Sequence, residues 1–156
     1  MHTGASRGAC RSLALLSVHT GERVNVEYFI EGHYEASSLR AINRVLRDHR
    51  NDEVHPIDTR TLNIIHAIRS MSGSHEPIHV VSGYRSPQTN ALLRMESSGV
   101  AEHSFHMSGQ AIDFYLPGRD LRTIRRAALA MRAGGVGYYP YDNFVHVDSG
   151  PVRRWG

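Results

Sequence analysis

The chain has 156 residues, with 40% hydrophobic and 21% charged residues, values typical of a folded globular domain and not of a disordered chain. Its formal net charge is +3 and its isoelectric point lies near 9.3. This mild basic excess is compatible with an anionic partner but does not identify which one. The arginines are scattered, which argues against a nucleic-acid-binding arm, and no apolar run is long enough for a transmembrane helix.

The start of the chain places arginines before a short apolar run at residues 13–18. This run is short for the apolar region of a secretory signal, and no small-residue cleavage site follows it, so we interpret it as a first strand. Cys10 is the one cysteine of the sequence, which excludes an intrachain disulfide. We expect one domain over residues 1–156, a flexible segment at 1–11, Cys10 before the first strand, and no export signal in this chain.

Hydrophobic periodicity predicts the elements of the first half. Two strand-like runs separated by a glycine-containing turn predict a hairpin, and two helical stretches follow it. Asp58 is a candidate N-cap for the second helix, and Gly73 is a candidate for its end. The expected elements are strands at 13–18 and 24–30, a helix at 37–49 and a helix at 59–72.

In the second half, the run "IHVVSGYRSP" predicts a buried strand that leads into a turn, and a short helix follows it. Asp120 is a candidate N-cap for a last helix that ends at Gly134-Gly135, and "FVHVDSG" predicts a final strand. The further expected elements are a helix at 89–95, a strand at 110–116 and a helix at 121–133. Because strands and helices do not alternate regularly, we predict an α+β fold with a mostly antiparallel sheet flanked by helices.

Three residues near these predicted strands could bind a metal. His106 and Asp113 lie seven residues apart around Gly109, and His146 lies on the final predicted strand. Two imidazoles, one carboxylate and an open fourth position are the pattern of a catalytic zinc site. Spacing alone leaves a second interpretation open, because a hydrogen-bonded histidine–aspartate pair near the surface fits it too.

The segment Ser104-x-His106-x-x-Gly109-x-Ala111-x-Asp113 matches the S-x-H-x-x-G-x-A-x-D motif of the zinc D-alanyl-D-alanine peptidases, which share the fold of the Hedgehog signalling domain. The segments "HTGE", "RDHR", "SGYRSPQTN" and "GGVGYYPYDNFVHVDSGPVRRW" resemble the murein endopeptidase K branch of that family. The resemblance therefore spans nearly the whole chain and implies the Hedgehog/DD-peptidase fold.

The resemblance also implies roles for individual residues. It implies zinc bound by His106, Asp113 and His146, and it implies an oxyanion-stabilising role for Arg85 of "GYRS". Ser104 is expected to position substrate or a metal ligand. Of the two tyrosines of "VGYYP", Tyr138 and Tyr139, we expect one to line a substrate groove and one to pack in the core. His103 is interpreted as a solvent-facing loop histidine, and Trp155 as a residue that packs the end of the chain.

The residues at the positions where the family carries its general base differ from the family pattern in this chain. The family's carboxypeptidases carry a carboxylate three residues before the last histidine ligand, where this chain has Asn143; related enzymes carry a His-x-His pair, of which the first position is Phe144 here. Strand alternation places Asp148 on the side of His146 and makes it the leading candidate base, with a second interpretation as a carboxylate that holds the ligand imidazole. Asp142, in a predicted loop, is the weaker candidate.

The resemblance implies a zinc metallopeptidase that acts on peptidoglycan stem peptides and opens their cross-links with a zinc-activated water. Such a substrate predicts a periplasmic or exported bacterial protein. No feature indicates an oligomeric state. The alternatives are a carboxypeptidase or dipeptidase of the same fold, an inactive zinc-containing peptidoglycan-binding domain, and a structural metal domain.

Overall fold

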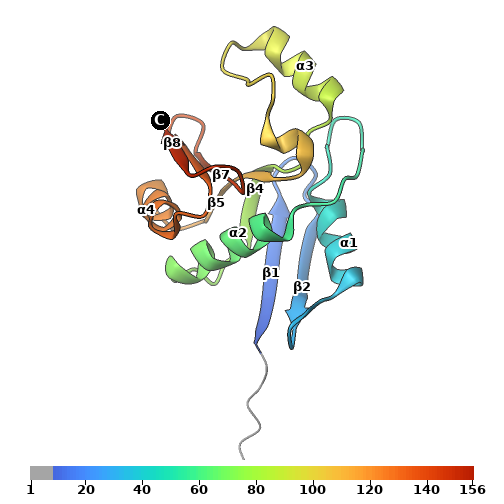
Figure 1. Cartoon of the computed structure of the whole chain (residues 1–156), viewed down its shortest axis with the longest axis vertical. Coiled ribbons are helices and arrows are strands. Elements are labelled where there is room, and N and C mark those ends of the chain that lie inside the picture. Colours follow the sequence, from blue (N-terminus) through green and yellow to red (C-terminus); the bar gives the residue numbers. More distant parts are fainter. Residues whose placement is uncertain (1–8) are drawn as a thin grey trace, which may run out of the picture.

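A computed structural model describes residues 9–156 of the chain, and these residues build one mixed sheet with helices around it (Figure 1). The strand order is β3-β2-β1-β4-β5-β7-β6-β8. The pairs β1–β4 and β6–β8 are parallel and the other neighbours are antiparallel, which confirms the predicted α+β class. The strands are β1 (Cys10–Ser17), β2 (Arg23–Ile30), β3 (His33–Tyr34), β4 (Ile78–Ser82), β5 (Ala111–Tyr115), β6 (Gly135–Tyr139), β7 (Phe144–Asp148) and β8 (Arg153–Trp155).

The predicted hairpin is present as β1 and β2, but β1 begins earlier than the sequence indicates. Cys10 pairs with Ile30 in the antiparallel ladder, and the Arg11 guanidinium lies 4.0 Å from the centroid of the Phe29 ring. The placement of Cys10 before the first strand is therefore wrong, and residues 10 and 11 do not belong to a flexible segment. Residues 1–8 of that predicted segment lie outside the described residues.

Four α-helices accompany the sheet: α1 (Ala36–Val45), α2 (Thr59–Met71), α3 (Pro87–Glu96) and α4 (Leu121–Met131). The predicted N-caps are confirmed, because Asp58 accepts a hydrogen bond from the Arg60 amide and Asp120 from the Arg122 amide. Helix α1 ends earlier than expected. The carbonyl of Leu46, just beyond its end, accepts from the Tyr84 amide and so joins the chain after α1 to the segment after β4.

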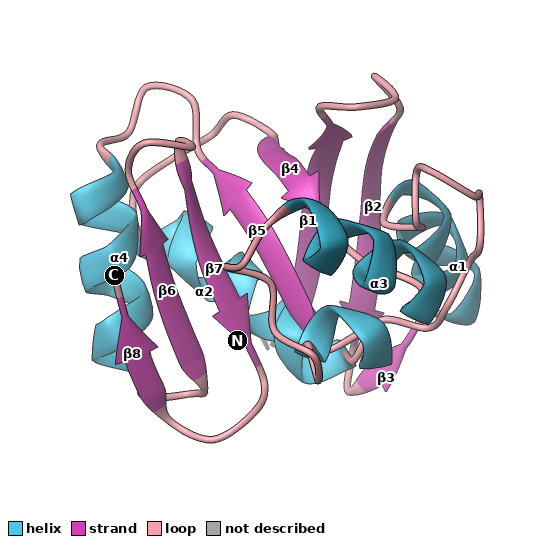
Figure 2. Cartoon of the chain, turned by 90° about the horizontal axis from the view of Figure 1, so that it is seen from above, coloured by secondary structure: helices cyan, strands magenta, loops and turns pink. Residues whose placement is uncertain are grey.

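The hydrophobic core lies between the sheet and the helices α2 and α4, which cover the same face in Figure 2. Alternation along β5 and β7 directs fully buried Ile112, Phe114, Val145 and Val147 into this core. Asp113 and the residues next to Val145 and Val147 consequently project from the opposite face. No helix within residues 9–156 has the length and apolar character needed to cross a membrane.

Strands β3, β6 and β8 are not predicted from the sequence. Strand β6 contains Gly135 and Gly137, and glycine is depleted in strands because it has no side chain to pack. Here the missing side chains make room: a Cβ at Gly135 would collide with Asp148 and Arg153, and a Cβ at Gly137 with the Trp155 ring. The two glycines therefore let β7 and β8 place large side chains over β6.

Candidate metal centre and peptidase site

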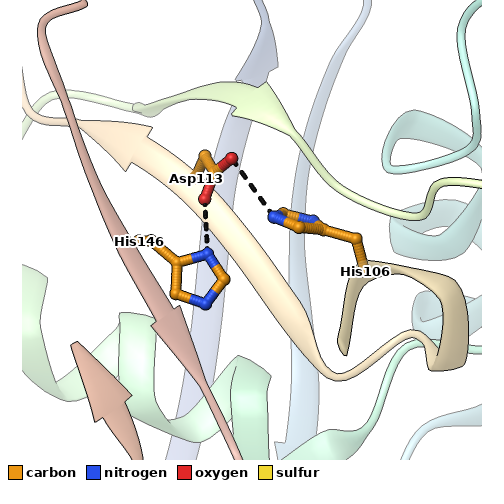
Figure 3. Close-up of side chains that lie close together, drawn as sticks. All are labelled: His106, Asp113 and His146. Atoms are coloured by element: carbon orange, nitrogen blue, oxygen red, sulfur yellow. Dashed lines mark hydrogen bonds and ion pairs between the residues drawn. The ribbon is translucent and has the colours of Figure 1, made fainter. Parts of the chain in front are cut away.

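Three buried side chains from separate elements converge on the open face of the sheet (Figure 3). His106 comes from the short 3-10 helix η1 (Phe105–Ser108), Asp113 from β5 and His146 from β7. Asp113 and His146 are direct partners in the β5–β7 ladder. One potential ligand atom from each residue lies within 4.8 Å of the other two, so the structure brings together all three predicted ligands.

The orientation of His106 leaves one ring nitrogen available to a metal. Its Nδ1 lies 2.7 Å from the Gly83 carbonyl oxygen, and because a carbonyl only accepts, Nδ1 carries the proton. The lone pair of a neutral ring is then on Nε2, which is buried without a hydrogen-bond partner among residues 9–156. This atom lies 3.2 Å from Oδ2 of Asp113 but lacks hydrogen-bond geometry toward it, as expected for two groups directed at a shared ion.

Local structure fixes His106 in this position. Ser104 caps η1, and its Oγ accepts a hydrogen bond from the His106 amide. Gly109 ends η1 with φ 69°, and a Cβ there would collide with the backbone of Pro56. Glycine at this position therefore allows the backbone to approach Pro56 closely, and the Gly109 carbonyl accepts from the Asp58 amide at the start of α2.

His146 is held between two carboxylates. Its Nδ1 lies 2.8 Å from Oδ1 of Asp113, and its Nε2 lies 2.7 Å from Oδ2 of Asp148. When Nε2 of the neutral ring donates to Asp148, the lone pair of Nδ1 faces Asp113. A second carboxylate that fixes the tautomer of a ligand imidazole is usual in zinc sites.

The charges of the site complement one another. Burial raises the pKa of Asp113, but the His106 and His146 rings beside it outweigh burial and hold that pKa well below its ordinary value. Burial lowers the pKa of His146, whereas its bonds to Asp113 and Asp148 raise it to about 9. The donor set of two imidazole nitrogens and one carboxylate, with an unpaired buried nitrogen among them, fits a zinc ion.

Arg85 lies beside this centre at the turn that leads into α3. Its amide donates to the His106 carbonyl, and its guanidinium donates to Oδ1 of Asn90 over 3.2 Å. Burial lowers the pKa of Arg85, and the Asp113 carboxylate counteracts that effect. Its Nε is buried without a partner among the described residues, so the guanidinium keeps donor capacity beyond its contacts in the fold.

The three converging residues and Arg85 line one cavity of about 380 Å³. Tyr139, Phe144 and Trp155 form an aromatic wall: the Tyr139 and Phe144 rings stack with centroids 4.6 Å apart, and Trp155 Nε1 donates to the Tyr139 hydroxyl over 2.7 Å. The Trp155 ring centroid lies 5.1 Å from that of His146. Trp155 thus belongs to the cavity and does not merely pack the end of the chain; its place depends on β8, which the sequence did not predict.

The other predicted site residues occupy different places. Tyr139 and Ser104 line the cavity, whereas Tyr138 packs against the core, with the Arg125 guanidinium 4.8 Å from its ring centroid. His103 is exposed and lines the cavity as well. Asp142 is exposed in the turn between β6 and β7 and is not part of the cavity lining.

Asp148 does not have the position of a base. It is fully buried behind His146, and its oxygens accept from the amides of Gly135 and Gly150 and from both terminal nitrogens of Arg153. Burial raises its pKa, but the bonds from His146 and Arg153 hold that pKa well below the ordinary value, which makes a poor proton acceptor. The structure therefore favours the second interpretation, a carboxylate that holds the ligand imidazole.

Position 143, where the family's carboxypeptidases carry a carboxylate, lies outside the cavity. Asn143 adopts φ 58° in the tight turn before β7. Asparagine is several-fold enriched in this left-handed region among residues other than glycine. The side chain of Asn143 is exposed and does not line the cavity.

Comparisons with known proteins agree with this arrangement. A family model described as peptidoglycan L,D-endopeptidase MepK matches residues 5–155. The chain belongs to this family. It is 45% identical over 145 residues to peptidoglycan L,D-endopeptidase MepK of Escherichia coli K12, covering 93% of this chain and 80% of that protein. It is 40% identical over 146 residues to a probable peptidoglycan L,D-endopeptidase MepK of Haemophilus influenzae, covering 93% and 78%.

Membership of this family confirms the predicted branch and the prediction of a peptidoglycan peptide hydrolase. The family is one of metallopeptidases, and the described residues include a His–Asp–His centre suited to a metal. Arg153 and Trp155 are the site residues that sequence reasoning missed. Both enter the site through the parallel pairing of β8 with β6, which no local sequence pattern indicates.

Proposed function

We propose that the protein is a zinc-dependent murein endopeptidase that hydrolyses peptide cross-links of peptidoglycan. The observation that carries the proposal is the buried, unpartnered Nε2 of His106, directed at Asp113 and His146 beside the free donor capacity of Arg85. In a structural metal domain, a guanidinium and an open cavity beside the metal have no role. In a peptidase, the cavity admits the substrate and the guanidinium can stabilise the oxyanion that forms from the peptide carbonyl.

His106, Asp113 and His146 would hold the zinc ion. When bound, zinc would supply a Lewis acid and lower the pKa of a bound water toward neutrality. Arg85 would donate to the oxygen of the scissile carbonyl, where negative charge develops as the carbonyl becomes tetrahedral. Asp148 would keep His146 in the tautomer whose Nδ1 faces the metal, and Ser104 would keep the backbone of His106 in place.

His103 is our candidate for the proton transfer. The ionisable side chains of the cavity lining are Arg85, His103, His106, Asp113, Tyr139, His146 and Arg153. Three of these are the proposed ligands, the arginines stay protonated, and the tyrosine hydroxyl already accepts from Trp155. His103 would accept a proton from the attacking water and return it to the leaving amine.

The cross-link that we propose as substrate joins two diaminopimelate residues. The relatives in Escherichia coli and Haemophilus influenzae are named L,D-endopeptidases. A D-alanine–diaminopimelate bridge joins two D centres, whereas a diaminopimelate–diaminopimelate bridge joins an L centre to a D centre. Because the sacculus lies outside the cytoplasm, we also propose a periplasmic or exported location.

Digestion of purified sacculi tests the proposal. Soluble products are separated and identified by mass after incubation with zinc-loaded protein. We expect diaminopimelate–diaminopimelate dimers to become monomers that keep their terminal residues. Release of terminal D-alanine alone would support a carboxypeptidase instead. Binding to sacculi without any product would support an inactive binding domain.

A further inference from the structure

The fold gathers arginines that are scattered in the sequence. Seven of the 18 basic residues, all arginines, lie between residues 119 and 156, against three aspartates in the same stretch. Of these aspartates, Asp148 is buried under Arg153. The basic excess of the whole chain therefore resides in this C-terminal quarter, which contains α4 and β8.

Two hollows join these arginines into one groove. A hollow of about 320 Å³ is lined by Arg122, Arg125, Arg126, Leu129 and Arg154. A second hollow of about 360 Å³ shares Leu129 and Arg154 with the first and adds Arg132 and Arg153. We call the surface formed by Arg122, Arg125, Arg126, Arg132 and Arg154 the arginine groove.

The arginine groove adjoins the peptidase cavity through β8, the edge strand at the left of Figure 2. Arg153 lines both the cavity and the second hollow. The next residue, Arg154, lines both hollows of the groove. A polymer chain that leaves the cavity past Arg153 would therefore meet the groove directly.

The guanidinium groups of the groove are largely free to bind a ligand. Arg122 contacts the exposed carboxylate of Asp120 over 3.5 Å, and Arg125 donates to the Gly156 carbonyl oxygen. No carboxylate within residues 9–156 forms an ion pair with Arg126, Arg132 or Arg154. Guanidinium groups recognise carboxylates through paired hydrogen bonds, and several of them on one surface repel each other unless an anion neutralises them.

The surroundings of the groove favour a carboxylate polymer over a lipid surface. A helix that lies in a membrane interface exposes an apolar face beside its basic face. Of the apolar side chains of α4, Ile124, Ala127 and Ala128 are buried in the core, and the half-buried Leu121, Leu129 and Met131 pack against it. The groove is thus basic without an exposed apolar helix face to insert into lipid.

We propose that the arginine groove binds the carboxylates of peptidoglycan stem peptides that flank the cross-link in the cavity. The proposal rests on the proposed function for the nature of the polymer. The groove would hold the enzyme on the mesh and leave bond cleavage to the cavity. Cleavage of a small soluble cross-linked dimer would therefore not depend on the groove.

The test compares two triple variants with the unaltered chain. The groove variant carries Arg122→Gln, Arg126→Gln and Arg154→Gln. The matched control carries Arg23→Gln, Arg40→Gln and Arg44→Gln, which are exposed and lie outside the cavity and both hollows. Binding to intact sacculi is measured by co-sedimentation with a chelator present, so that the mesh stays whole, and cleavage of a soluble diaminopimelate-linked dimer is measured with zinc.

We expect the groove variant to bind sacculi roughly tenfold more weakly, because it lacks three exposed charge contacts. Binding of the unaltered chain should weaken with added salt, which screens such contacts. The control should bind as the unaltered chain does, and all three proteins should cleave the dimer at similar rates. Equal sacculus binding by the groove variant, or an equal loss in the control, would overturn the proposal. The proposal would also be overturned if the groove variant bound sacculi normally but lost binding to vesicles that contain phosphatidylglycerol. If the unaltered chain does not cleave the dimer, the proposed function fails while the binding result stands.

Discussion

Asp148 lies directly behind His146, with its Oδ2 2.7 Å from Nε2 of the ring, on the side opposite Asp113. The carboxylate that strand alternation places next to the proposed metal ligand therefore orients that ligand from behind. This relationship gives the first of five predictions.

Replacement of Asp148 by asparagine should weaken zinc binding by about 10- to 100-fold, because a neutral amide is a weaker acceptor than a carboxylate and its NH2 group can face the ring instead, so that the tautomer is no longer fixed. The measurement is zinc affinity by competition with a chelating dye. Asp142→Asn, in the exposed turn before β7, is the control and should bind zinc normally. Unchanged zinc affinity with lost activity in Asp148→Asn would return Asp148 to the role of base.

Replacement of His106 by alanine should abolish stoichiometric zinc binding, because its Nε2 is one of three converging ligand atoms. The zinc content of purified protein checks this. Chelation of the unaltered chain should lower its melting temperature, since an ion that binds only the folded state stabilises it. His106→Ala should show no such shift, and a shift of equal size in the variant would place the metal elsewhere.

Replacement of Arg85 by glutamine should lower kcat by about 100- to 1,000-fold, the usual effect of removing one donor from an oxyanion site. Zinc content should stay the same because Arg85 is not a proposed ligand. Steady-state kinetics on a soluble cross-linked dimer separate kcat from KM. A rise in KM with kcat unchanged would assign Arg85 to substrate binding alone.

Replacement of His103 by glutamine should lower kcat by about 100-fold or more, because the attacking water loses the proposed proton acceptor. His75→Gln, an exposed histidine outside the cavity, is the matched control and should keep the rate of the unaltered chain. An unchanged kcat in His103→Gln, with zinc content retained, would exclude His103 from proton transfer.

Replacement of Asp48 by alanine should destabilise the fold by about 1–3 kcal/mol, because buried Asp48 accepts hydrogen bonds from the amides of Ser86 and Arg50. Burial raises the pKa of Asp48, but bonds from Thr89 and Ser86 outweigh burial and lower it. A lowered folded-state pKa means that this stabilisation is complete above the ordinary carboxyl pKa near 4 and is lost as pH falls further.

Urea unfolding at several pH values measures the effect of Asp48. The difference between the unaltered chain and Asp48→Ala should be constant near neutral pH and should shrink in acid. A difference that grows as pH falls would contradict the assignment, because it would mean that the folded state binds the proton more tightly than the unfolded state does.

Much of the fold could be predicted because local signals agree with the tertiary structure. Asp58 and Asp120 cap helices as their position before apolar stripes indicates, and the β1–β2 hairpin follows from alternation around a turn. Strand β6 could not be predicted, because Gly135 and Gly137 indicate a loop until the side chains that occupy their space are known. His106 and Asp113 could be predicted from the spacing of a motif that spans η1 and the start of β5, and His146 from its place on the last predicted strand.

The chemistry around these residues was harder to predict. Alternation places Asp148 and His146 on one face but does not tell which ring nitrogen meets which carboxylate. Trp155 and Arg153 enter the site through the parallel pairing of β8 with β6, and the sequence carries no local sign of this pairing. The arginine groove is likewise a tertiary feature, assembled from α4 and β8.

His146 also depends on a short strand at the edge of the sheet. Arg153 holds Asp148, and Trp155 lies against the His146 ring, yet both belong to the three-residue strand β8 at the far end of the sheet. A change that unpairs β8 from β6 would therefore remove the support of a proposed ligand without altering any of the three converging residues.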